Sequence, residues 1–456
     1  MANSRARFAL WGTILKLAWP LIVANSFWNL QLTIDRIFLG RYATEALGAA
    51  IAVMGVFWTP MALLQQTAAY LTTFVAQYFG AKENKNIGAA MWQAIYLSWI
   101  GGLLFLGLIP LAEPGFALIG HAPAMTAMEI DYFRALCHSA LPTALVAVAS
   151  SFFSGLGQTR RVMEINAIGL VGNVILDYCM IFGHFGFPEL GVAGAGYATA
   201  AATWCSAIYA GILVFQQQHE RDFAVRSAWH LNLDLLRRYL RYGVPSGLQW
   251  ALEGLAFTVV MILIGRMQQG EAALAASGIA ATIMMIAALP TMGVAQAVTI
   301  ALGQYLGEGQ PELARRQVWG GVQLGLIYVT VMGLSFVLIP HFYLSWFENA
   351  ANAALWQEVS AIAVRLLWFI AVFVGFDSMN IMFSFALKGS GDTRFVSLVA
   401  LVVPWPLMVL PTWLMEEWPG AVYWAWAAAS VFIICQAVFF LQRFRGGKWQ
   451  TMSVIH

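Results

Sequence analysis

The chain of 456 residues contains very little charge. Only 10% of its residues are Asp, Glu, Lys or Arg, whereas 60% are hydrophobic, and the mean hydropathy is +0.71. A soluble globular domain carries about 25% charged residues, so this deficit excludes a soluble protein. The net charge of +2 is too small to indicate a nucleic-acid partner.

Cysteines and the common enzyme motifs are also scarce. Cys137, Cys179, Cys205 and Cys435 are scattered, with no C-x-x-C pair, so we interpret them as packing residues. The sequence contains no G-x-x-x-x-G-K-[ST], no H-E-x-x-H and no G-x-S-x-G, which argues against ATP-driven transport and common hydrolytic chemistry. We therefore predict that the protein is not an enzyme and needs no cofactor.

Long apolar runs make up most of the chain. A helix needs about 20 apolar residues to cross a bilayer, and the alternation expected of a β-barrel is missing. The predicted fold class is an all-α integral membrane protein with twelve transmembrane helices. Their approximate ranges are 14–40, 46–79, 88–112, 131–154, 161–183, 192–216, 241–265, 273–306, 317–340, 359–387, 394–414 and 419–442.

Positive charge gathers on one side of these spans. Nineteen Lys and Arg residues fall on the side of the two termini, whereas the opposite loops hold only Arg41 and Arg266. Cytoplasmic loops collect positive charge, so we predict a multi-pass protein of the inner (plasma) membrane with both termini in the cytoplasm.

The two halves of the chain resemble each other. "AWPLIV" around Pro20 matches "YGVPSG" around Pro245, 225 residues later, and "SGLGQTR" matches "KGSGDTR" 234 residues later. Six spans per half give both copies the same direction, so a pseudo-two-fold axis along the membrane normal is expected. We predict an N-lobe at 1–216, a cytoplasmic linker at 217–240 and a C-lobe at 241–456.

Four acidic residues lie inside the predicted spans, where an ionisable side chain is a functional candidate by default. Asp35 and Asp177 lie roughly 7–9 Å below the outer ends of their spans, at 1.5 Å per residue. Glu253 and Asp377 lie roughly 16–18 Å from the cytoplasmic face. The sequence therefore predicts one acidic pair in each half.

Polar neighbours and structural alternatives accompany these acids. Asn173 is one turn from Asp177, and Gln249 is one turn before Glu253. Asp35 alone is also compatible with a residue that extends toward the membrane surface. Asn173 is compatible with simple helix–helix hydrogen bonding, and Glu253 with a bond to Asp377.

With these residues assembled, the chain resembles the multidrug and toxic compound extrusion (MATE) family, NorM-type branch, over nearly its whole length. The resemblance rests on "IDRIFLGRYATEALGAA", on the "GLGQTR" and "GSGDTR" loops and on "GVAGAGYAT". It implies a secondary antiporter that exports cationic, lipophilic drugs or toxic compounds in exchange for H⁺ or Na⁺.

The resemblance also implies site residues. The family's N-lobe cation site maps onto Asp35, Asn173, Asp177 and Thr199, and its C-lobe acidic pair maps onto Glu253 and Asp377, near Gln249. Pro20 matches the position of a proposed bend in helix 1. Some NorM-type members carry a tyrosine where this chain has Phe373, and some carry an amide where it has Asp177.

Aromatic and sulfur side chains near the mid-depth acids Glu253 and Asp377 are candidates for an adaptable drug pocket, because Trp faces attract cations and Met repacks around varied ligands. These candidates are Trp28, Trp250, Phe257, Met284, Met285 and Phe373. Apart from a Na⁺ at either acidic pair, no metal is predicted. We expect a monomer with small-molecule substrates and membrane lipid as its partners.

Three other functional classes are alternatives. A lipid-linked oligosaccharide flippase is the main alternative, but such a cavity is rich in cations, whereas acids occupy these spans. A membrane enzyme is disfavoured by the missing motifs. A channel is the third alternative, and a measurement of stoichiometric counter-transport would distinguish a carrier from it.

Overall fold

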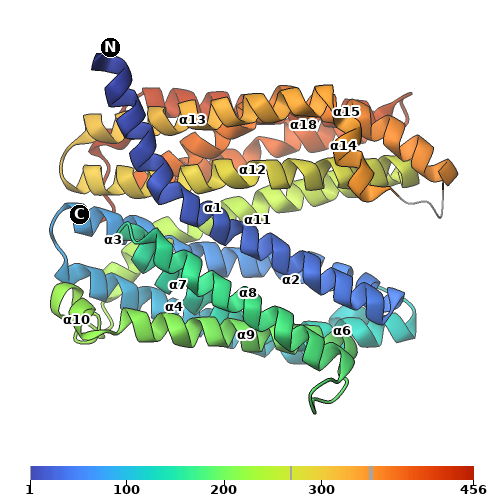
Figure 1. The fold of residues 1–456 in the computed structure, drawn as a ribbon, viewed down its shortest axis with the longest axis horizontal. Helices are drawn as coiled ribbons and strands as arrows, with labels where there is room; N and C mark the ends of the chain where they lie inside the picture. Colours follow the sequence, from blue (N-terminus) through green and yellow to red (C-terminus); the bar gives the residue numbers. More distant parts are fainter. Residues whose placement is uncertain (1, 268–269, 349–352) are drawn as a thin grey trace. The chain divides into compact units, whose positions relative to one another are not determined.

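The structure, a computed structural model, describes residues 2–267, 270–348 and 353–456, and within these ranges it contains helices and no β-strand. Eleven of the described helical segments are long and apolar enough to cross a membrane, and one bent pair of helices makes a twelfth. The prediction of an all-α membrane protein with twelve spans is therefore confirmed (Figure 1).

The helices form two compact units. The N-terminal unit comprises Val23–Trp250, Gly303–Gly309 and Val454–His456. The C-terminal unit comprises Met1–Ile22, Ala251–Leu302 and Gln310–Ser453. Two of the helices that are divided between the units, α1 (Ala2–Tyr42) and α11 (Leu233–Arg266), contain Pro20 and Pro245. Each proline removes a backbone hydrogen bond, and each lies within a few residues of the division.

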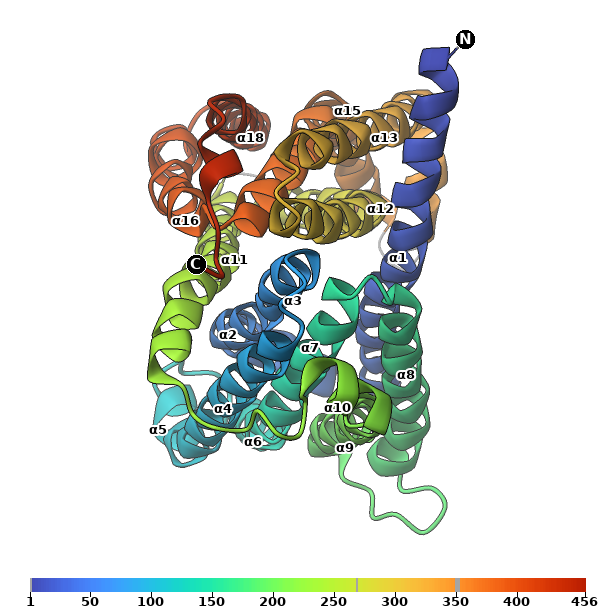
Figure 2. The same ribbon diagram turned by 90° about the vertical axis from the view of Figure 1, so that its left-hand side faces the viewer.

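The N-terminal unit is a bundle around α7, which packs against α3, α4 and α9, while α8 and α9 pack along their lengths (Figure 2). Its remaining helices are α2 (Thr44–Ala69), α3 (Leu71–Gly80), α4 (Lys85–Leu108), η1 (Ile109–Leu111), α5 (Ala112–Ala117), α6 (Pro123–Cys137), α7 (Ala140–Gly155), α8 (Thr159–Phe182), α9 (Gly191–Val214) and α10 (Gln217–Phe223).

The predicted span 131–154 is not one continuous helix. It is divided into α6 and α7, which meet at an angle of 40°. Pro142 lies just after the break and cannot donate a backbone hydrogen bond to His138. The amides of His138 and Ser139 instead donate to carbonyls three residues earlier, at 3.2 and 2.8 Å, and the Ser139 hydroxyl donates to the Leu136 carbonyl at 2.7 Å.

The segment 217–240, predicted as a linker, is held against α4. Trp92 Nε1 donates to the Val225 carbonyl at 2.8 Å, and the Tyr96 hydroxyl donates to the Trp229 carbonyl. Gln93, which is fully buried, donates to the carbonyl of His230 at 3.3 Å and accepts from the amide of Asn232. These hydrogen bonds fix the backbone of the segment to the N-terminal unit.

The C-terminal unit is built around α15, which packs against α13 and α18. Its helices are α12 (Gly270–Gly307), α13 (Pro311–Leu338), α14 (Pro340–Leu344), η2 (Ser345–Phe347), α15 (Ala353–Ser390), α16 (Thr393–Val402), η4 (Trp405–Val409), α17 (Leu410–Leu414), α18 (Ala421–Arg445) and η5 (Lys448–Thr451). The π-helical η4 interrupts the predicted span 394–414, where Pro404, Pro406 and Pro411 remove three backbone donors.

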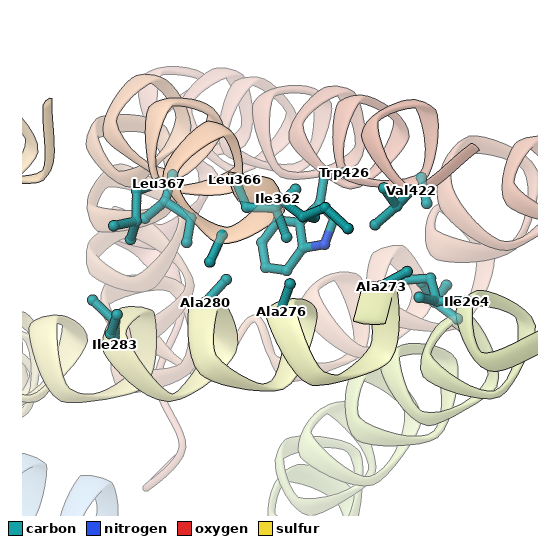
Figure 3. Packing of buried hydrophobic residues seen from close by; sticks show 14 of the residues in the cluster. Ile264, Ala273, Ala276, Ala280, Ile283, Ile362, Leu366, Leu367, Val422 and Trp426 are labelled. Carbon is teal, nitrogen blue, oxygen red and sulfur yellow. The ribbon is translucent and has the colours of Figure 1, made fainter. Parts of the chain in front are cut away.

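Small residues bring α12 close to its neighbours in this unit. Ala273, Ala276 and Ala280 face α15 and α18, where Leu366 and Trp426 pack over them (Figure 3). The Trp426 indole donates to the Ser277 hydroxyl at 3.0 Å, so its one polar atom has a partner. Small side chains allow this approach because membrane helices associate through close van der Waals packing.

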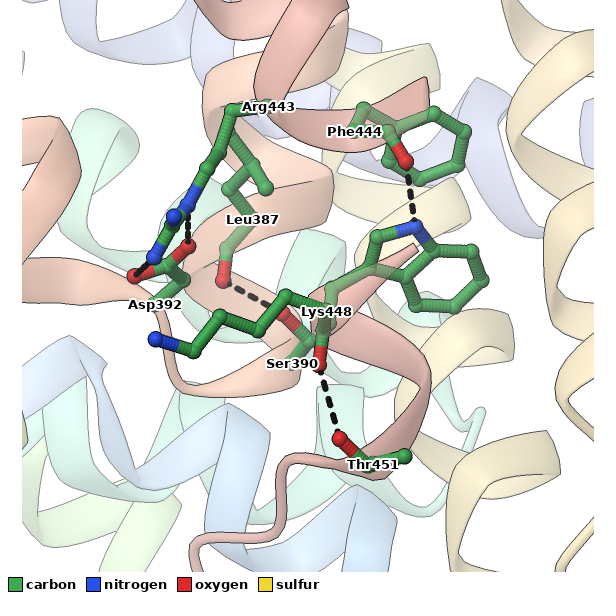
Figure 4. Close-up of polar contacts among 8 residues, drawn as sticks. Leu387, Ser390, Asp392, Arg443, Phe444, Lys448 and Thr451 are labelled. Carbon is green, nitrogen blue, oxygen red and sulfur yellow. Dashed lines mark hydrogen bonds and ion pairs between the residues drawn. The ribbon is translucent and has the colours of Figure 1, made fainter. Parts of the chain in front are cut away.

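The end of the sequence contributes to both units. At the end of α18, Arg443 forms a two-pronged ion pair with Asp392, at 2.6 and 3.2 Å (Figure 4). Trp449 is buried in the C-terminal unit and stacks on Phe444, with 4.7 Å between the ring centroids. A few residues later, buried Val454 donates its amide hydrogen to Gln77 Oε1 at 2.9 Å within the N-terminal unit.

The alanine face of α12 gives a test of this packing. Ala276→Leu forces additional methyl groups into a filled interface, so the variant should lose about 1–3 kcal/mol of stability and melt at a lower temperature in detergent. Ala275→Leu, on the exposed side of the same helix, is the matched control and should melt like the parent protein. Equal melting temperatures for both variants would contradict the described packing.

Candidate functional site

Four polar side chains from three helices meet inside the N-terminal unit: Asp35 of α1, Asn173 and Asp177 of α8, and Thr199 of α9. We call this group the acid–amide cluster. Asn173 and Asp177 are 0% exposed and Asp35 is 7% exposed. The four-residue spacing places Asn173 and Asp177 on one face of α8, and the packing of α8 on α9 brings Thr199 to the same place.

Asn173 bridges the two carboxyl groups. Its amide nitrogen lies 2.9 Å from Asp35 Oδ1 and 3.2 Å from Asp177 Oδ2, and its amide oxygen lies 3.3 Å from Thr199 Oγ1. In this orientation the amide nitrogen faces hydrogen-bond acceptors and the amide oxygen faces a hydroxyl donor. The Thr199 hydroxyl also lies 2.9 Å from the Ala195 carbonyl. A single amide therefore orients both acids.

The two carboxyl groups are also direct neighbours, within hydrogen-bonding distance of each other. Two ionised carboxylates cannot hydrogen-bond to each other, because each offers only acceptors. Asp177 Oδ1 is buried and has no hydrogen-bond partner. The geometry therefore suits a bound proton or a small cation, either of which would reduce the repulsion between the acids.

A cavity adjoins the cluster, and Asp35 is the one charged side chain among its lining residues. Two indoles, of Trp28 and Trp58, lie 5.5 Å apart in its wall. The lining residues are Trp28, Gln31, Leu32, Asp35, Met54, Phe57, Trp58, Met61, Tyr132, Leu136, Ser139, Thr143, Thr199 and Thr203. The cavity thus combines aromatic and sulfur-containing walls with one carboxyl group.

Tyr132 of α6 is a site residue that the sequence analysis missed. It is buried, lines the cavity together with Asp35 and lies close enough to feel the charges of Asp35 and Asp177. Its sequence neighbourhood, "EIDYFRAL", carried a signal, because Glu129 lies three residues before it on the same side of a helix.

The C-terminal unit holds the second pair of predicted acids. Glu253 of α11 accepts a hydrogen bond of 2.8 Å from Gln436 Nε2 of α18, a partner that the sequence analysis did not identify. Asp377 of α15 lies near Asn380 and close enough to Glu253 for their charges to interact. Both acids are half-buried.

A buried cation lies in the same unit. Lys388, which the charge pattern placed with the cytoplasmic loops, is buried on α15. Its Nζ lies 4.4 Å from the centroid of the Phe385 ring, and its charge interacts with that of Glu253. The acids of the C-terminal unit therefore have resident polar and charged partners.

The other predicted pocket residues occupy different environments. Trp28 lines the cavity beside Asp35, whereas Phe257 lines a second, apolar cavity with Val260, Met408 and Trp426. Phe373 is buried in the C-terminal core, Met284 packs against that core, and Met285 is exposed. Gln249 is buried, Trp250 is half-buried, and Pro20 is buried within α1.

Within the described residues, no group of three or more His, Cys, Asp or Glu side chains is arranged to hold a metal ion. The acid–amide cluster contains two carboxylates, an amide and a hydroxyl, which are oxygen ligands of the kind that hard cations prefer. Its residues would accept a Na⁺ as well as a proton.

The fold and this site place the chain among membrane transporters, and comparison with known proteins identifies the family. The MatE family model matches residues 20–179 and again residues 245–414. The chain therefore belongs to the MatE family, whose members are transporters and not enzymes. The two matches begin at Pro20 and Pro245, which agrees with the 225-residue repeat seen in the sequence.

Two relatives and one solved structure show the extent of the similarity. The probable multidrug resistance protein NorM of Thermotoga maritima is 26% identical, covering 97% of this chain and 94% of the relative. The probable multidrug resistance protein NorM of Xanthomonas campestris is 30% identical, covering 86% of this chain and 84% of the relative. A multidrug resistance MATE family transporter solved in an outward-facing conformation superposes with a TM-score of 0.87, covering 97% of each chain at 20% identity.

The hydrogen bond between Gln436 and Glu253 can be tested by a double-mutant cycle. Gln436→Leu removes a donor from a carboxylate and should cost about 1–3 kcal/mol of stability. The same substitution in a Glu253→Met background should cost much less, because the acceptor is already gone. Thermal melting in detergent measures all four proteins, and an equal cost in the two backgrounds would refute the pairing.

Proposed function

We propose that this protein exports lipophilic organic cations, and that the acid–amide cluster couples this export to the inward movement of H⁺ or Na⁺. One observation carries the proposal: Asp35 belongs to the cluster and to the wall of the aromatic cavity at once. The names of the NorM relatives, multidrug resistance proteins, support the same substrate class.

Exchange follows from competition for Asp35. A buried charge is costly unless it is paired, so the carboxyl pair of Asp35 and Asp177 is stable when a proton or Na⁺ neutralises it. An organic cation in the cavity can neutralise Asp35 instead. If the two kinds of cation favour different conformations of the transporter, the binding of one drives the release of the other.

The cavity walls suit varied hydrophobic cations. The faces of Trp28 and Trp58 attract positive charge, with a contribution of about 0.5–2 kcal/mol for each contact. Met54 and Met61 have flexible, polarisable side chains that repack around ligands of different shape. The carboxyl group of Asp35 then favours positively charged substrates, while the remaining wall accepts substrates of different shapes.

The internal repeat supports the assignment of coupling to the N-terminal unit. The residue 225 positions after Asp35 is Val260, and the residue 234 positions after Asn173 is Leu407. Val260 is buried in the apolar core of the C-terminal unit, and Leu407 packs against it. The second copy thus lacks the carboxyl and amide groups at these places.

The C-terminal acids serve a different role in this proposal. Glu253 is bonded to Gln436 and is attracted by the charge of Lys388, so a transported ion would have to compete with groups that cannot leave. We propose that Glu253 and Asp377 tune substrate binding and that the coupling ion binds at Asp35 and Asp177. We propose that α1 bends near Pro20 when this ion binds.

We further propose that the protein works as a monomer in the plasma membrane with its termini in the cytoplasm. The excess of positive charge on one set of loops supports this orientation, and the cavity and the cluster are both contained in a single chain.

Neutralising either acid of the cluster should abolish coupled transport. Asp35→Asn and Asp177→Asn each remove a site for H⁺ or Na⁺, and we expect efflux of ethidium from reconstituted vesicles to fall by at least roughly 100-fold, as for loss of a group that handles the transferred proton. The pH and Na⁺ gradients are imposed independently, so that the response of the parent protein also identifies the coupling ion.

The matched control is Asp131→Asn, the same change at an exposed acid of α6, which should leave efflux unchanged. If Asp35→Asn and Asp177→Asn both pumped at the parent rate under either gradient, the carboxyl pair could not be the coupling site.

The aromatic wall can be tested separately from coupling. Trp28→Ala and Trp58→Ala each remove a ring face, and each should weaken equilibrium binding of tetraphenylphosphonium by roughly 2- to 30-fold, the equivalent of a cation–π contact of about 0.5–2 kcal/mol. Trp99→Ala, at an exposed indole of α4, is the control. Unchanged affinity in both cavity variants would place the substrate elsewhere.

A further inference from the structure

A second buried carboxyl group lies in the N-terminal unit outside the acid–amide cluster. Glu129 of α6 is 0% exposed, although it lies within seven residues of the start of its helix. Its Oε1 is 2.7 Å from Nδ1 of His121, and its Oε2 is buried without a hydrogen-bond partner. A carboxyl group half satisfied in this way is costly to bury, so a purely structural role explains it poorly.

His121 connects this buried group to the surface. The imidazole side chain is 37% exposed, and it lies in the short segment between α5 and α6, on the face predicted to be external. Histidine gains and loses a proton near neutral pH and can carry one proton on each ring nitrogen. The pair therefore joins an exposed proton acceptor to a buried one through a single short hydrogen bond.

The same helix leads from Glu129 to the cluster. Tyr132 follows Glu129 by three residues, which places both on one side of α6. Tyr132 lines the cavity that also contains Asp35, and Tyr132 feels the charges of both Asp35 and Asp177. A proton on Glu129 is thus one helical turn from a hydroxyl group at the wall of the Asp35 cavity.

We propose that His121 and Glu129 form the outer entrance of the proton path to the acid–amide cluster. External water gives a proton to Nε2 of His121, and the ring passes its Nδ1 proton to Glu129 Oε1, which leaves a neutral imidazole and a neutral carboxylic acid. Glu129 then releases its proton toward the cavity at Tyr132, where Asp35 or Asp177 accepts it. No other reactant is needed.

Other charged groups near α6 leave this pair isolated. They are exposed Asp131, the Arg134–Glu113 ion pair at 3.4 Å, exposed Glu45 at the start of α2, and exposed Tyr197 of α9, whose ring is tilted against His138 at 5.7 Å between centroids. The charge of Arg36 on α1 also acts on Tyr132. Among the described ion pairs, His121 is the only partner of Glu129. Changes at these two residues should therefore act on proton entry alone.

The inference rests on the proposed function, with the proton as coupling ion, and the test separates the two. Glu129→Gln keeps an acceptor for His121, and His121→Asn keeps a donor for Glu129, so both variants preserve the hydrogen bond and lose the ability to carry a proton. Vesicles are loaded with ethidium, and initial proton-driven efflux is measured while both solutions are moved together from about pH 6 to about pH 8, the range in which histidine titrates, at a fixed gradient.

We expect each variant to lose at least roughly tenfold in rate at the high-pH end, where protons are scarce, and to approach the parent rate at the low-pH end. Gradient-independent exchange of ethidium across the membrane should be unchanged, because the cavity is intact. Thr126→Val, which removes a 3.3 Å hydrogen bond to the His121 carbonyl, is the control for a loosened loop and should show the parent profile.

Parent-like pH profiles in both variants, together with loss of transport in Asp35→Asn, would overturn the entrance and leave the proposed function standing. Loss of rate in Thr126→Val equal to that in Glu129→Gln would also overturn it, by showing that the pair only anchors the loop. If Asp35→Asn and Asp177→Asn transported normally, the proposed function itself would fail.

Discussion

Two carboxyl groups share one amide donor in an apolar interior, and their negative charge is the main electrostatic constraint on this protein. Asn173 can donate one hydrogen to each of Asp35 and Asp177, but it cannot cancel their negative charge. Water, which would normally do so, is largely replaced by hydrophobic side chains, and charge interactions are stronger in such a medium. A proton or a small cation could supply the missing positive charge, and the proposed coupling rests on this possibility. The folded chain supplies the rigid part, the pairing of α8 with α9, while α1 brings in Asp35 from a helix that contains a proline.

The acid–amide cluster occurs in only one of the two similar halves of the described chain. Both halves match the same family model, yet the positions that correspond to Asp35 and Asn173 are Val260 and Leu407. Val260 lines an apolar cavity together with Met408 and Trp426, and Leu407 packs against the apolar core of the same unit. The C-terminal unit instead carries its acids elsewhere, at Glu253 and Asp377, with Gln436 and Lys388 as resident partners. The two halves thus share a family model while their buried polar groups differ.

The sequence predicted the class of fold well, because hydropathy, loop charge and the 225-residue repeat report directly on membrane spans. It also singled out Asp35, Asn173 and Asp177 as candidates, since charge inside an apolar run is conspicuous and a four-residue spacing defines a helix face, and the structure places the three side chains together. It missed the bend at His138, which depends on Pro142 and a neighbouring Ser139 side chain. It did not single out Tyr132, Glu129 or Gln436, because their contacts with other parts of the chain form only in the folded structure. Lys388 looked like a loop cation because its burial depends on tertiary packing.

The last residues of the sequence have a practical consequence. Trp449 is stacked inside one unit, whereas Val454 and Ile455 are buried in the other, where Arg238 donates to the Ile455 carbonyl at 2.6 Å. An affinity tag or fluorescent reporter fused directly after His456 would disturb the segment from Trp449 to Ile455, which is packed at its start and hydrogen-bonded at its end. A spacer of several flexible residues would spare those contacts, and reporters placed without one would perturb the very molecule whose expression and activity they are meant to monitor.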